Sequence, residues 1–387
     1  MKKLLFLSVA AGMSAALSAA IYGDTPDAKH AWAVHDRNRP NPVKVTANPG
    51  GIPSDAVILF DGSKASFEKN WCSVKDPTKN TWKFVDGAIE SVKGAGYIMT
   101  KESFGDCQLH LEWASPVKVE GMGQGRGNSG VFLMGNYEIQ VLDSYETDPS
   151  KDPNPNPNYA DGQASAVYAE NPPLVNACRG PGEWQTYDIV FHQPVWKDGK
   201  MVHPGSITVF HNGVLTQDHW EMEGLTTHQR RRPLAPHATR LPLRFQDHGN
   251  PVRFRNVWIR DIPSRYANTT HGGPGVKESD VMALRAKTAA KLFEKVDTSK
   301  HDGETVSKIL EVVSYCKDDK YLSFCKKAVA GYIADLDKLD AKGIDAKKGE
   351  ILRLKRETDV LLRNKVMDKC CLNAKLVQIA KSKKWIK

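Results

Sequence analysis

Two acids and an amide lie close together in the stretch YEIQVLDSY, residues 137–145. Glu138 and Gln140 alternate with apolar residues, and this period is typical of a half-buried strand that carries both polar side chains on one face. Asp143 follows one residue later than the alternation requires. Because a carboxyl group can take up or release a proton during a reaction, two acids on one surface predict acid–base chemistry there.

The position of Asp143 depends on whether the strand is regular. In a regular strand Asp143 faces away from Glu138 and Gln140, but a β-bulge at Val141-Leu142 would turn all three side chains to the same face. Bulges are frequent beside active sites, so we expect the three groups to converge. The alternative is that Asp143 begins the next loop and caps a turn.

A second group of polar residues occurs in QDHG, residues 246–249. His248 titrates near neutral pH and therefore joins the candidate catalytic residues. Gln246 shares a face with it if the chain is extended, whereas Asp247 points away or caps the turn before Gly249. Oxygen and nitrogen ligands for a divalent metal ion would come from Glu138, Asp143 and His248, although no spacing demonstrates such a site.

The elements that carry these residues have the signals of strands. Apolar alternation recurs every 10 to 20 residues, with Gly, Asn and Asp at the turns, and predicts an antiparallel β-sandwich or jelly roll. Asp-Gly within 81–91 and Gly-Asn within 128–145 mark two hairpins. The expected strands lie in 57–62, 81–91, 107–115, 128–145, 184–196, 206–215 and 251–262.

Two long loops interrupt the strands. Residues 148–162 contain several prolines, which remove backbone donors and predict irregular structure. Residues 228–240 are basic and equally irregular. Long loops in a compact β domain often form the rim of a binding site, and the alternative is a plain surface excursion.

The hydrophobic period changes after residue 275. Residues 321–339 carry an apolar stripe of helical period, and similar stripes occupy roughly 279–296, 304–316, 349–363 and 366–382. We therefore expect an α-helical domain over 276–387. It contains no catalytic constellation, so it is either a module that binds a protein partner or a stabilising appendage.

Charge and apolar content limit the partners. The net charge of +9 lies after residue 275, where 26 Lys and Arg accompany 17 Asp and Glu, whereas the preceding residues carry 28 of each. The basic residues are dispersed Lys without interleaved aromatics, which disfavours nucleic acid. No second apolar segment of spanning length follows the N-terminus, so no membrane span is expected.

The N-terminus predicts export. Residues 1–20 combine Lys2 and Lys3, a short apolar stretch and small residues for cleavage, which is the pattern of a signal peptide, and the stretch is shorter than a membrane anchor needs. We expect a periplasmic or extracellular protein, with residues 21–55 as a linker or surface strap. Seven cysteines follow, and the four of the last third either form two disulfides or stay buried thiols.

The spacing E-x-Q-x-x-D of residues 138–143 resembles the bulged catalytic strand of laminarinase-type β-glucanases, E-x-D-x-x-E. In that family two Glu act across a glycosidic bond as nucleophile and acid/base. Here the central acid is replaced by Gln140 and the last by the shorter Asp143. The ordinary retaining pair is therefore not reproduced.

A wider resemblance covers 56–262. The blocks LFDG, RGNSGVFLMGNYEIQVLDSY, GEWQTYDIVF, VFHNGV and LPLRFQDHGNPVRFRNVWIRDI occur in order and resemble the 3-keto-disaccharide hydrolase domain family. The resemblance implies a concanavalin-like jelly roll over 56–264 and cleavage of glycosides whose C3 is oxidised to a ketone. A C3 ketone acidifies the C2 proton, so a base, an enolate stabiliser and a proton donor suffice for elimination at C1.

The resemblance also assigns roles to residues in these blocks. Glu138, Asp143 and His248 are expected to be catalytic. Arg126 and Arg244 would stabilise an oxyanion or form rim salt bridges, and Tyr168 and Trp184 would stack on a sugar or belong to the core. The full set expected to bind substrate is Arg126, Asn128, Gln140, Tyr168, Trp184, Arg244, Gln246 and Asp247.

Two other functions remain open from the sequence. A carbohydrate-binding module without catalysis shares this fold class. An ordinary sandwich glycosidase would require two carboxyl groups about 5–5.5 Å apart for retention or about 6.5–9.5 Å apart for inversion.

Overall fold

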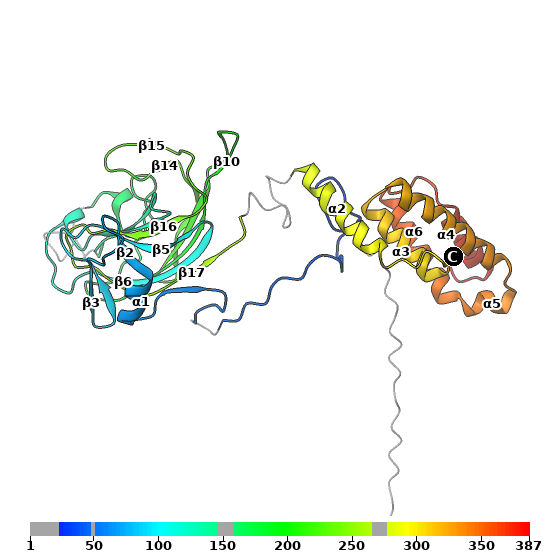
Figure 1. The fold of residues 1–387 in the computed structure, drawn as a ribbon, viewed down its shortest axis with the longest axis horizontal. Coiled ribbons are helices and arrows are strands. Elements are labelled where there is room, and N and C mark those ends of the chain that lie inside the picture. Colours follow the sequence, from blue (N-terminus) through cyan, green and yellow to red (C-terminus); the bar gives the residue numbers. More distant parts are fainter. Residues whose placement is uncertain (1–22, 48–50, 146–157, 265–276) are drawn as a thin grey trace, which may run out of the picture. The chain divides into compact units, whose positions relative to one another are not determined.

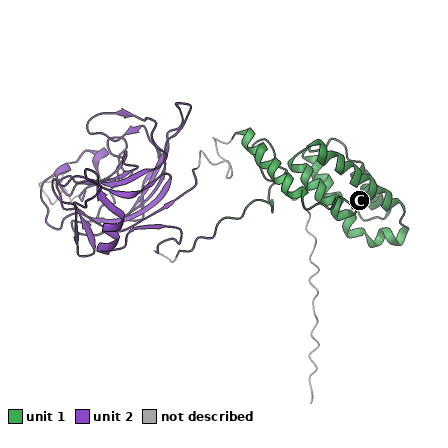
Figure 2. Cartoon of the chain, in the orientation of Figure 1, with its two compact units in different colours: residues 1–42, 269–387 green, residues 43–268 purple. Residues whose placement is uncertain are grey.

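The computed structural model describes residues 23–47, 51–145, 158–264 and 277–387. The chain forms two compact units (Figure 2), and each has its own hydrophobic core. The β unit comprises residues 43–268. The helical unit combines residues 1–42 with 269–387. The segment before residue 55, expected to be a linker or strap, is thus divided between the units.

The β unit is a sandwich of two antiparallel sheets (Figure 1), which confirms the predicted fold class. The larger sheet has the order β13-β12-β9-β6-β17-β4-β3, and β1 also pairs with β17. Its strands are β13 (Val214–Glu221), β12 (Ser206–His211), β9 (Gln185–His192), β6 (Cys107–Ala114), β17 (Arg253–Asp261), β4 (Ala88–Glu90), β3 (Lys83–Val85) and β1 (Val57–Phe60).

The smaller sheet has the order β2-β5-β16-β7-β8. The apolar residues that alternate along both sheets pack together between them as one core. Short two-stranded ribbons form from β10 with β11 and from β14 with β15. The remaining elements of this unit are β2 (Trp71–Ser73), β5 (Ile98–Phe104), β16 (Leu241–Phe245), β7 (Ser129–Leu133), β8 (Tyr137–Val141), β10 (Val195–Lys197), β11 (Lys200–His203), β14 (Gly224–Leu225), β15 (Arg232–Pro233) and α1 (Lys64–Asn70).

The predicted hairpins form at the turn residues that the sequence provides. Asp86 and Gly87 both have positive φ, 50° and 73°, between β3 and β4. Two consecutive positive φ values define the turn whose twist matches paired strands. Residues 134–136 connect β7 to β8, and that pair continues in register from Ser129↔Val141 to Leu133↔Tyr137.

The outer edge of β8 is covered by an irregular segment. The N–H of Gln140 donates to the Ala166 carbonyl at 3.0 Å, and the N–H of Tyr168 donates to the Glu138 carbonyl at 3.1 Å. These bonds satisfy the backbone groups that an edge strand would leave open. All five residues of β8 are consequently buried.

The helical unit contains the expected helices. Asp302, Asp318 and Asp340 each accept a backbone N–H at a helix N-terminus, which stabilises α3, α4 and α5. The short α5 lies in a region where no separate helix was predicted, and α7 begins later than its apolar stripe. The helices are α2 (Glu278–Phe293), α3 (Gly303–Tyr315), α4 (Asp319–Asp337), α5 (Ala341–Ala346), α6 (Lys348–Arg363) and α7 (Cys371–Ser382).

The N-terminal segment completes the helical unit. Trp32 packs against its core, and Asn38 donates to Glu311 Oε1 at 2.7 Å. The Tyr315 hydroxyl donates to Asp36 Oδ2. Residues 23–42 are therefore part of this unit, although they are separated from its helices by more than 200 residues.

Several expectations are only partly covered by the described residues. The predicted signal peptide, residues 1–20, lies wholly outside them, and so does most of loop 148–162; the described end of that loop forms a short 3₁₀ helix, Ala160–Gly162. All seven cysteines are described, and all are free thiols, so the two disulfides are not formed. In the described ranges no helix has the length and apolar character to cross a membrane.

Candidate active site

The outer face of the smaller sheet carries polar residues opposite the core. Ile139 and Val141 of β8 point into the core, so Glu138 and Gln140 point to the other face. Strand pairing places Gln140 beside Gly130 of β7. The N–H of Gln246, just after β16, donates to the Gly130 carbonyl at 3.0 Å. The polar residues of three adjacent strands thus share one face.

A glycine makes room for the central acid. A Cβ atom added at Gly130 would lie 2.2 Å from Glu138 Oε1 and 2.9 Å from Phe132 Cε2. Neither distance is compatible with a side chain at this position. Glycine in the NSG sequence at 128–130 therefore allows the Glu138 carboxyl group to lie over β7.

Glu138 is a buried acid without a polar partner for its carboxyl group. Its residue surface is 3% exposed, and among the described residues its carboxyl group makes no hydrogen bond or ion pair. Removal from water disfavours the charged form and raises the pKa of Glu138 to about 8. The backbone N–H of Glu138 donates to Thr226 Oγ1 at 2.9 Å, which anchors the residue. Such an acid exchanges its proton near neutral pH.

An amide cluster lies beside this acid. Gln140 Nε2 donates to Gln124 Oε1 at 3.1 Å and to Asn128 Oδ1 at 3.3 Å. Asn128 Nδ2 donates to the backbone carbonyl of Gln124 at 2.7 Å. Within the described chain, Gln140 Oε1 is left without a hydrogen-bond partner. This amide oxygen is a candidate acceptor for a ligand hydroxyl group.

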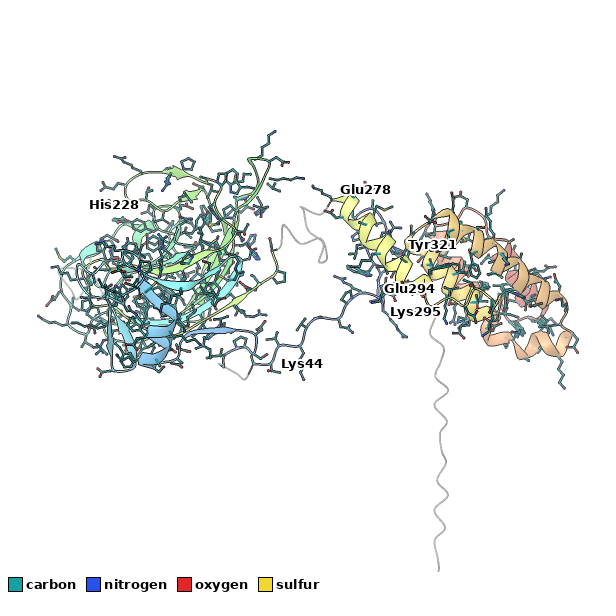
Figure 3. The ribbon with its side chains drawn as sticks, in the orientation of Figure 1. Lys44, His228, Glu278, Glu294, Lys295 and Tyr321 are labelled. Atoms are coloured by element: carbon teal, nitrogen blue, oxygen red, sulfur yellow. The ribbon has the colours of Figure 1, made fainter. Side chains whose placement is uncertain are left out.

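A chain of hydroxyl groups lines the other side. Tyr159 and Tyr168 share a hydrogen bond of 2.9 Å, and the Tyr168 hydroxyl lies 2.9 Å from His228 Nδ1. Burial, the bond to Tyr159 and the charge of Glu138 all raise the pKa of Tyr168, so its hydroxyl stays protonated. His228 lies on the outside of the β unit (Figure 3).

Apart from Tyr159, these groups line one cavity of about 250 Å³. His248 is exposed at this cavity, and Gln246 Nε2 donates to the Tyr97 hydroxyl at 2.8 Å. The cavity thus offers one acid, two histidines, tyrosines and several amides. Its lining consists of Tyr97, Gln124, Asn128, Phe132, Glu138, Gln140, Tyr168, Thr226, Thr227, His228, Gln246 and His248.

Comparison with known proteins identifies the β unit. Residues 55–260, just over half of the chain, match the 3-keto-alpha-glucoside-1,2-lyase-like domain. The chain belongs to this family. A protein of Parabacteroides distasonis ATCC 8503, named a "putative glycosyl hydrolase", has a crystal structure with 39% identity and a TM-score of 0.52. That similarity covers 58% of this chain and 93% of the other.

A second protein of the same organism bears the same name. Its identity is 20% and its TM-score 0.39, over 54% of this chain and 94% of the other. No curated protein matches the chain. The 3-keto-alpha-glucoside-1,2-lyase-like domain is thus a carbohydrate-active domain with the sandwich fold described above, and the matched region ends before the helical unit.

Six of the residues predicted to form the site line this cavity of the lyase-like domain. They come from β8, from the segment covering its edge, and from the turns that precede β7 and follow β16. The six residues are Asn128, Glu138, Gln140, Tyr168, Gln246 and His248.

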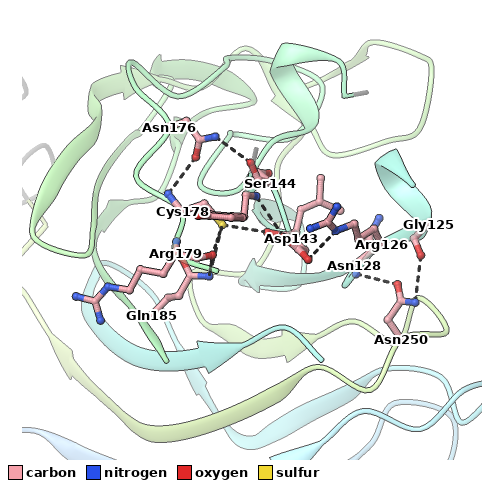
Figure 4. Close-up of polar contacts among 12 residues, drawn as sticks. Gly125, Arg126, Asn128, Asp143, Ser144, Asn176, Cys178, Arg179, Gln185 and Asn250 are labelled. Carbon is pink, nitrogen blue, oxygen red and sulfur yellow. Dashed lines mark hydrogen bonds and ion pairs between the residues drawn. The ribbon is translucent and has the colours of Figure 1, made fainter. Parts of the chain in front are cut away.

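Asp143 does not join them, and the predicted bulge is wrong. The pairing of β7 with β8 has no register shift, and β8 ends at Val141. Asp143 then lies 2% exposed beside a different cavity, where its Oδ2 accepts from Arg126 Nε at 2.7 Å (Figure 4). Its Oδ1 accepts from the Tyr145 N–H at 3.2 Å. Asp143 therefore begins the next loop and caps a turn, which was the alternative prediction.

Four other predicted residues also lie away from the cavity lining. Arg126 forms an ion pair with Asp143. The Arg255 guanidinium carbon lies 4.0 Å from the centroid of the Trp184 ring. Trp184 lines another cavity. Asp247 accepts the N–H groups of Gly96 and Gly249 and therefore caps a turn.

Arg244 is the last of these residues. It lies opposite Phe132 on the outer face, and its Nε is buried without a hydrogen-bond partner among the described residues. It is therefore beside the cavity without lining it.

The proposed metal ligands are not brought together. Glu138 and His248 line the cavity, but Asp143 lies elsewhere. Across the described ranges, no three His, Cys, Asp or Glu side chains are arranged to hold a metal ion. The predicted ligand set therefore does not fit, and no step below depends on it.

Six lining residues were not predicted. Phe132 lies opposite Glu138 in the β7–β8 hairpin. Tyr97, next to β5, and Gln124, in a 3₁₀ turn, come from parts of the chain whose approach spacing alone does not reveal. His228 is the first residue of the basic segment 228–240 that was expected to form a rim, and Thr226 and Thr227 immediately precede that segment. The signal for His228 was its position in that loop.

Proposed function

We propose that the β unit cleaves 3-keto-glucosides by elimination, with Glu138 as the base. The observation that carries the proposal is a buried, unpartnered carboxyl group with its pKa raised to about 8, facing a cavity rich in amide side chains. A general base is most effective when its pKa lies near the working pH. Membership in the lyase-like family supports the same substrate class.

The reaction begins at C2 of the oxidised sugar. The Glu138 carboxylate takes the C2 proton, and the C–H electron pair forms a C2=C3 double bond while the ketone oxygen becomes an enolate. Donors at the cavity wall stabilise that negative oxygen. We assign this role to the Tyr97 hydroxyl, which is free to donate because it accepts from Gln246 Nε2, and to His248.

The second step breaks the bond at C1. The enolate electrons return to form the C3 ketone, the C2–C3 pair moves to C1=C2, and the aglycone oxygen leaves. Tyr168 gives this oxygen a proton, and the proton is replaced through His228. The product is an unsaturated ketone, and addition of water across C1=C2 gives the 3-keto sugar.

A second feature argues against the ordinary glycosidase. Among the described residues that line the cavity, Glu138 is the single carboxylate. Retaining and inverting enzymes of the usual type need a second carboxyl group within about 9.5 Å of the first across the sugar. Asp143, the predicted partner, is held by Arg126 beside another cavity.

The test compares methyl glucoside with methyl 3-keto-glucoside, using the full chain in D₂O. We expect cleavage of the oxidised sugar alone, with deuterium incorporated at C2. Glu138→Gln should lower kcat/KM by about 10²–10⁴-fold. Glu102→Gln, an exposed acid on β5, is the matched control and should leave the rate unchanged.

Two results would contradict the proposal. Cleavage of the unoxidised glucoside at a comparable rate would indicate conventional hydrolysis. Binding of either sugar without cleavage would indicate a carbohydrate-binding domain instead.

We further propose that the protein acts after export, in the periplasm or outside the cell; detection of the mature N-terminus in a cell fraction would test this.

A further inference from the structure

A second cavity, of about 280 Å³, adjoins the first. Tyr168 and Thr227 line both cavities, so these two residues form the common wall. The other side of the second cavity is built by the ribbon of β14 and β15 at the rim of the sandwich (Figure 1). The second cavity therefore begins at the side of the Glu138 cavity that Tyr168 and Thr227 form.

We propose that the second cavity binds the leaving group and selects one that carries a negative charge. This inference rests on the proposed function, because it takes the first cavity as the site of the oxidised sugar. The chemical class is an alcohol or second sugar with a carboxylate, sulfate or phosphate group about one ring away from the bond that breaks.

The cavity is held in a fixed form by a partly buried acid, Glu170. Glu170 Oε1 accepts the Gly224 N–H at 2.8 Å, and its Oε2 accepts the Glu223 N–H at 3.1 Å and the Trp220 indole N–H at 3.3 Å. A Cβ atom at Gly224 would lie 2.3 Å from the Arg232 carbonyl oxygen. The glycine and the three N–H donors thus fix the ribbon against the sandwich.

Three consecutive arginines supply the charge. Arg231 pairs with Glu223 at 3.6 Å. Arg230 and Arg232 line the cavity, and the described residues include no ion-pair partner for either. Glu170 also lines the cavity, but both of its carboxyl oxygens are already engaged by N–H donors of the ribbon and of Trp220.

The guanidinium group suits the proposed ligand. It presents paired N–H donors whose geometry matches two oxygens of a carboxylate, sulfate or phosphate group. A neutral sugar offers no such pair of charged oxygens. Two arginines without partners on one wall therefore favour an anionic leaving group over a neutral one.

The experiment uses three 3-keto disaccharides that differ only at C6 of the second sugar, which is a hydroxymethyl, carboxylate or 6-O-sulfate group. The readout is the kcat/KM of each anionic substrate divided by that of the neutral one. Arg230→Gln/Arg232→Gln should lower this ratio by about tenfold or more, since a charge-assisted hydrogen bond contributes about 1.5–3 kcal/mol. Lys200→Gln, an exposed cation on β11, is the control and should leave the ratio unchanged.

Comparing the carboxylate and sulfate substrates shows which anionic group the second cavity recognises. A fall in both ratios supports a general anion site, and a fall in one identifies the group that is recognised. If the neutral substrate is cleaved and the double variant alters neither ratio, the inference is wrong and the proposed function stands.

A binding measurement tests the anion site even if the proposed cleavage activity is absent. Calorimetry on the wild-type chain compares methyl glucuronide with methyl glucoside. If no 3-keto substrate is cleaved, tighter binding of the glucuronide that is lost in the double variant still supports an anion-selective saccharide site. Equal binding of the two glycosides, unaffected by the double variant, overturns it.

Discussion

At the scale of single residues, the site depends on one acid kept out of water. Glu138 is buried by the segment that covers β8, and its carboxyl group has no partner among the described residues to hold it in the charged form. Its chemistry is therefore set by desolvation rather than by a neighbouring charge. Two measurable consequences follow from a pKa of about 8.

The first consequence is the pH dependence of the rate. A base must be ionised before it can take a proton, so kcat/KM should rise about tenfold per pH unit below pH 8 and level off above it. The measurement is kcat/KM on a 3-keto-glucoside from pH 5.5 to 9.5. A rate that is already maximal at pH 6 would show that another group is the base.

The second consequence is a pH-dependent cost in stability. Between the ordinary Glu value of 4.5 and about 8, the unfolded state has lost this proton while the folded state keeps it. Folding then becomes less favourable as pH rises, by up to about 1.4 kcal/mol per pH unit. Glu138→Gln should remove this loss, so denaturant titrations should show its stability gain over wild type growing from pH 5.5 to 7.5. A gain that does not change with pH would contradict the assignment.

At the scale of elements, strand register decides which residues meet. The sequence alone predicted the two β-hairpins, the sandwich and the positions of Glu138 and Gln140, because period-two alternation and turn residues are local signals. It could not predict Tyr97, because its approach depends on the order β2-β5-β16-β7-β8. It could not predict Gln124 either, because that residue lies in a 3₁₀ turn and contacts β8 through its side chain. Asp143 was misplaced because a strand end and a bulge leave the same break in the alternation.

Gly130→Ala tests the packing between β7 and β8. The added methyl group would lie 2.2 Å from Glu138 Oε1, so the acid must move. We expect a stability loss of about 1–3 kcal/mol and a loss of most activity. Thermal unfolding and kcat/KM measure both effects. Gly125→Ala is the control, since nothing lies within 4 Å of its added Cβ; equal effects of the two changes would argue against a special role for Gly130.

Asp143→Asn separates a structural acid from a catalytic one. Asp143 is 2% and Arg126 16% exposed at the side chain, so the change leaves a largely buried cation without its ion-pair partner. We expect a stability loss of about 3 kcal/mol or more. Well below the melting temperature, the activity of the folded variant should stay within about threefold of wild type. A hundredfold loss in fully folded protein would restore Asp143 to the catalytic set.

At the scale of the whole molecule, the β unit is inserted into the helical unit. Residues 43–268 lie between the N-terminal segment and the helices that it contacts. Sequence patterns marked the helices but not this arrangement, because Trp32 and Asp36 lie in a Pro- and Asn-rich stretch without periodicity. The contact with Tyr315 had no local signal.

Asp36→Ala tests whether the N-terminal segment stabilises the helical unit. Asp36 accepts the Tyr315 hydroxyl and the backbone N–H groups of Ala33 and Asn38. Their loss should destabilise the helical unit by about 1–3 kcal/mol, measured by the helical circular dichroism signal during unfolding. Cleavage activity should not change, and Asp368→Ala, an exposed acid of the same unit, should have no effect. Unchanged unfolding of Asp36→Ala would refute the structural role.

The insertion also orders events on the ribosome. Residues 23–42 leave the ribosome before the β unit, yet the helices that cover Trp32 are made only after residue 268. At a synthesis rate of about 5–20 residues per second, the Trp32 indole remains without its packing partners for about 10–45 s. A chain that stops before the helices are made therefore leaves this tryptophan without the apolar core that it packs against in the complete helical unit.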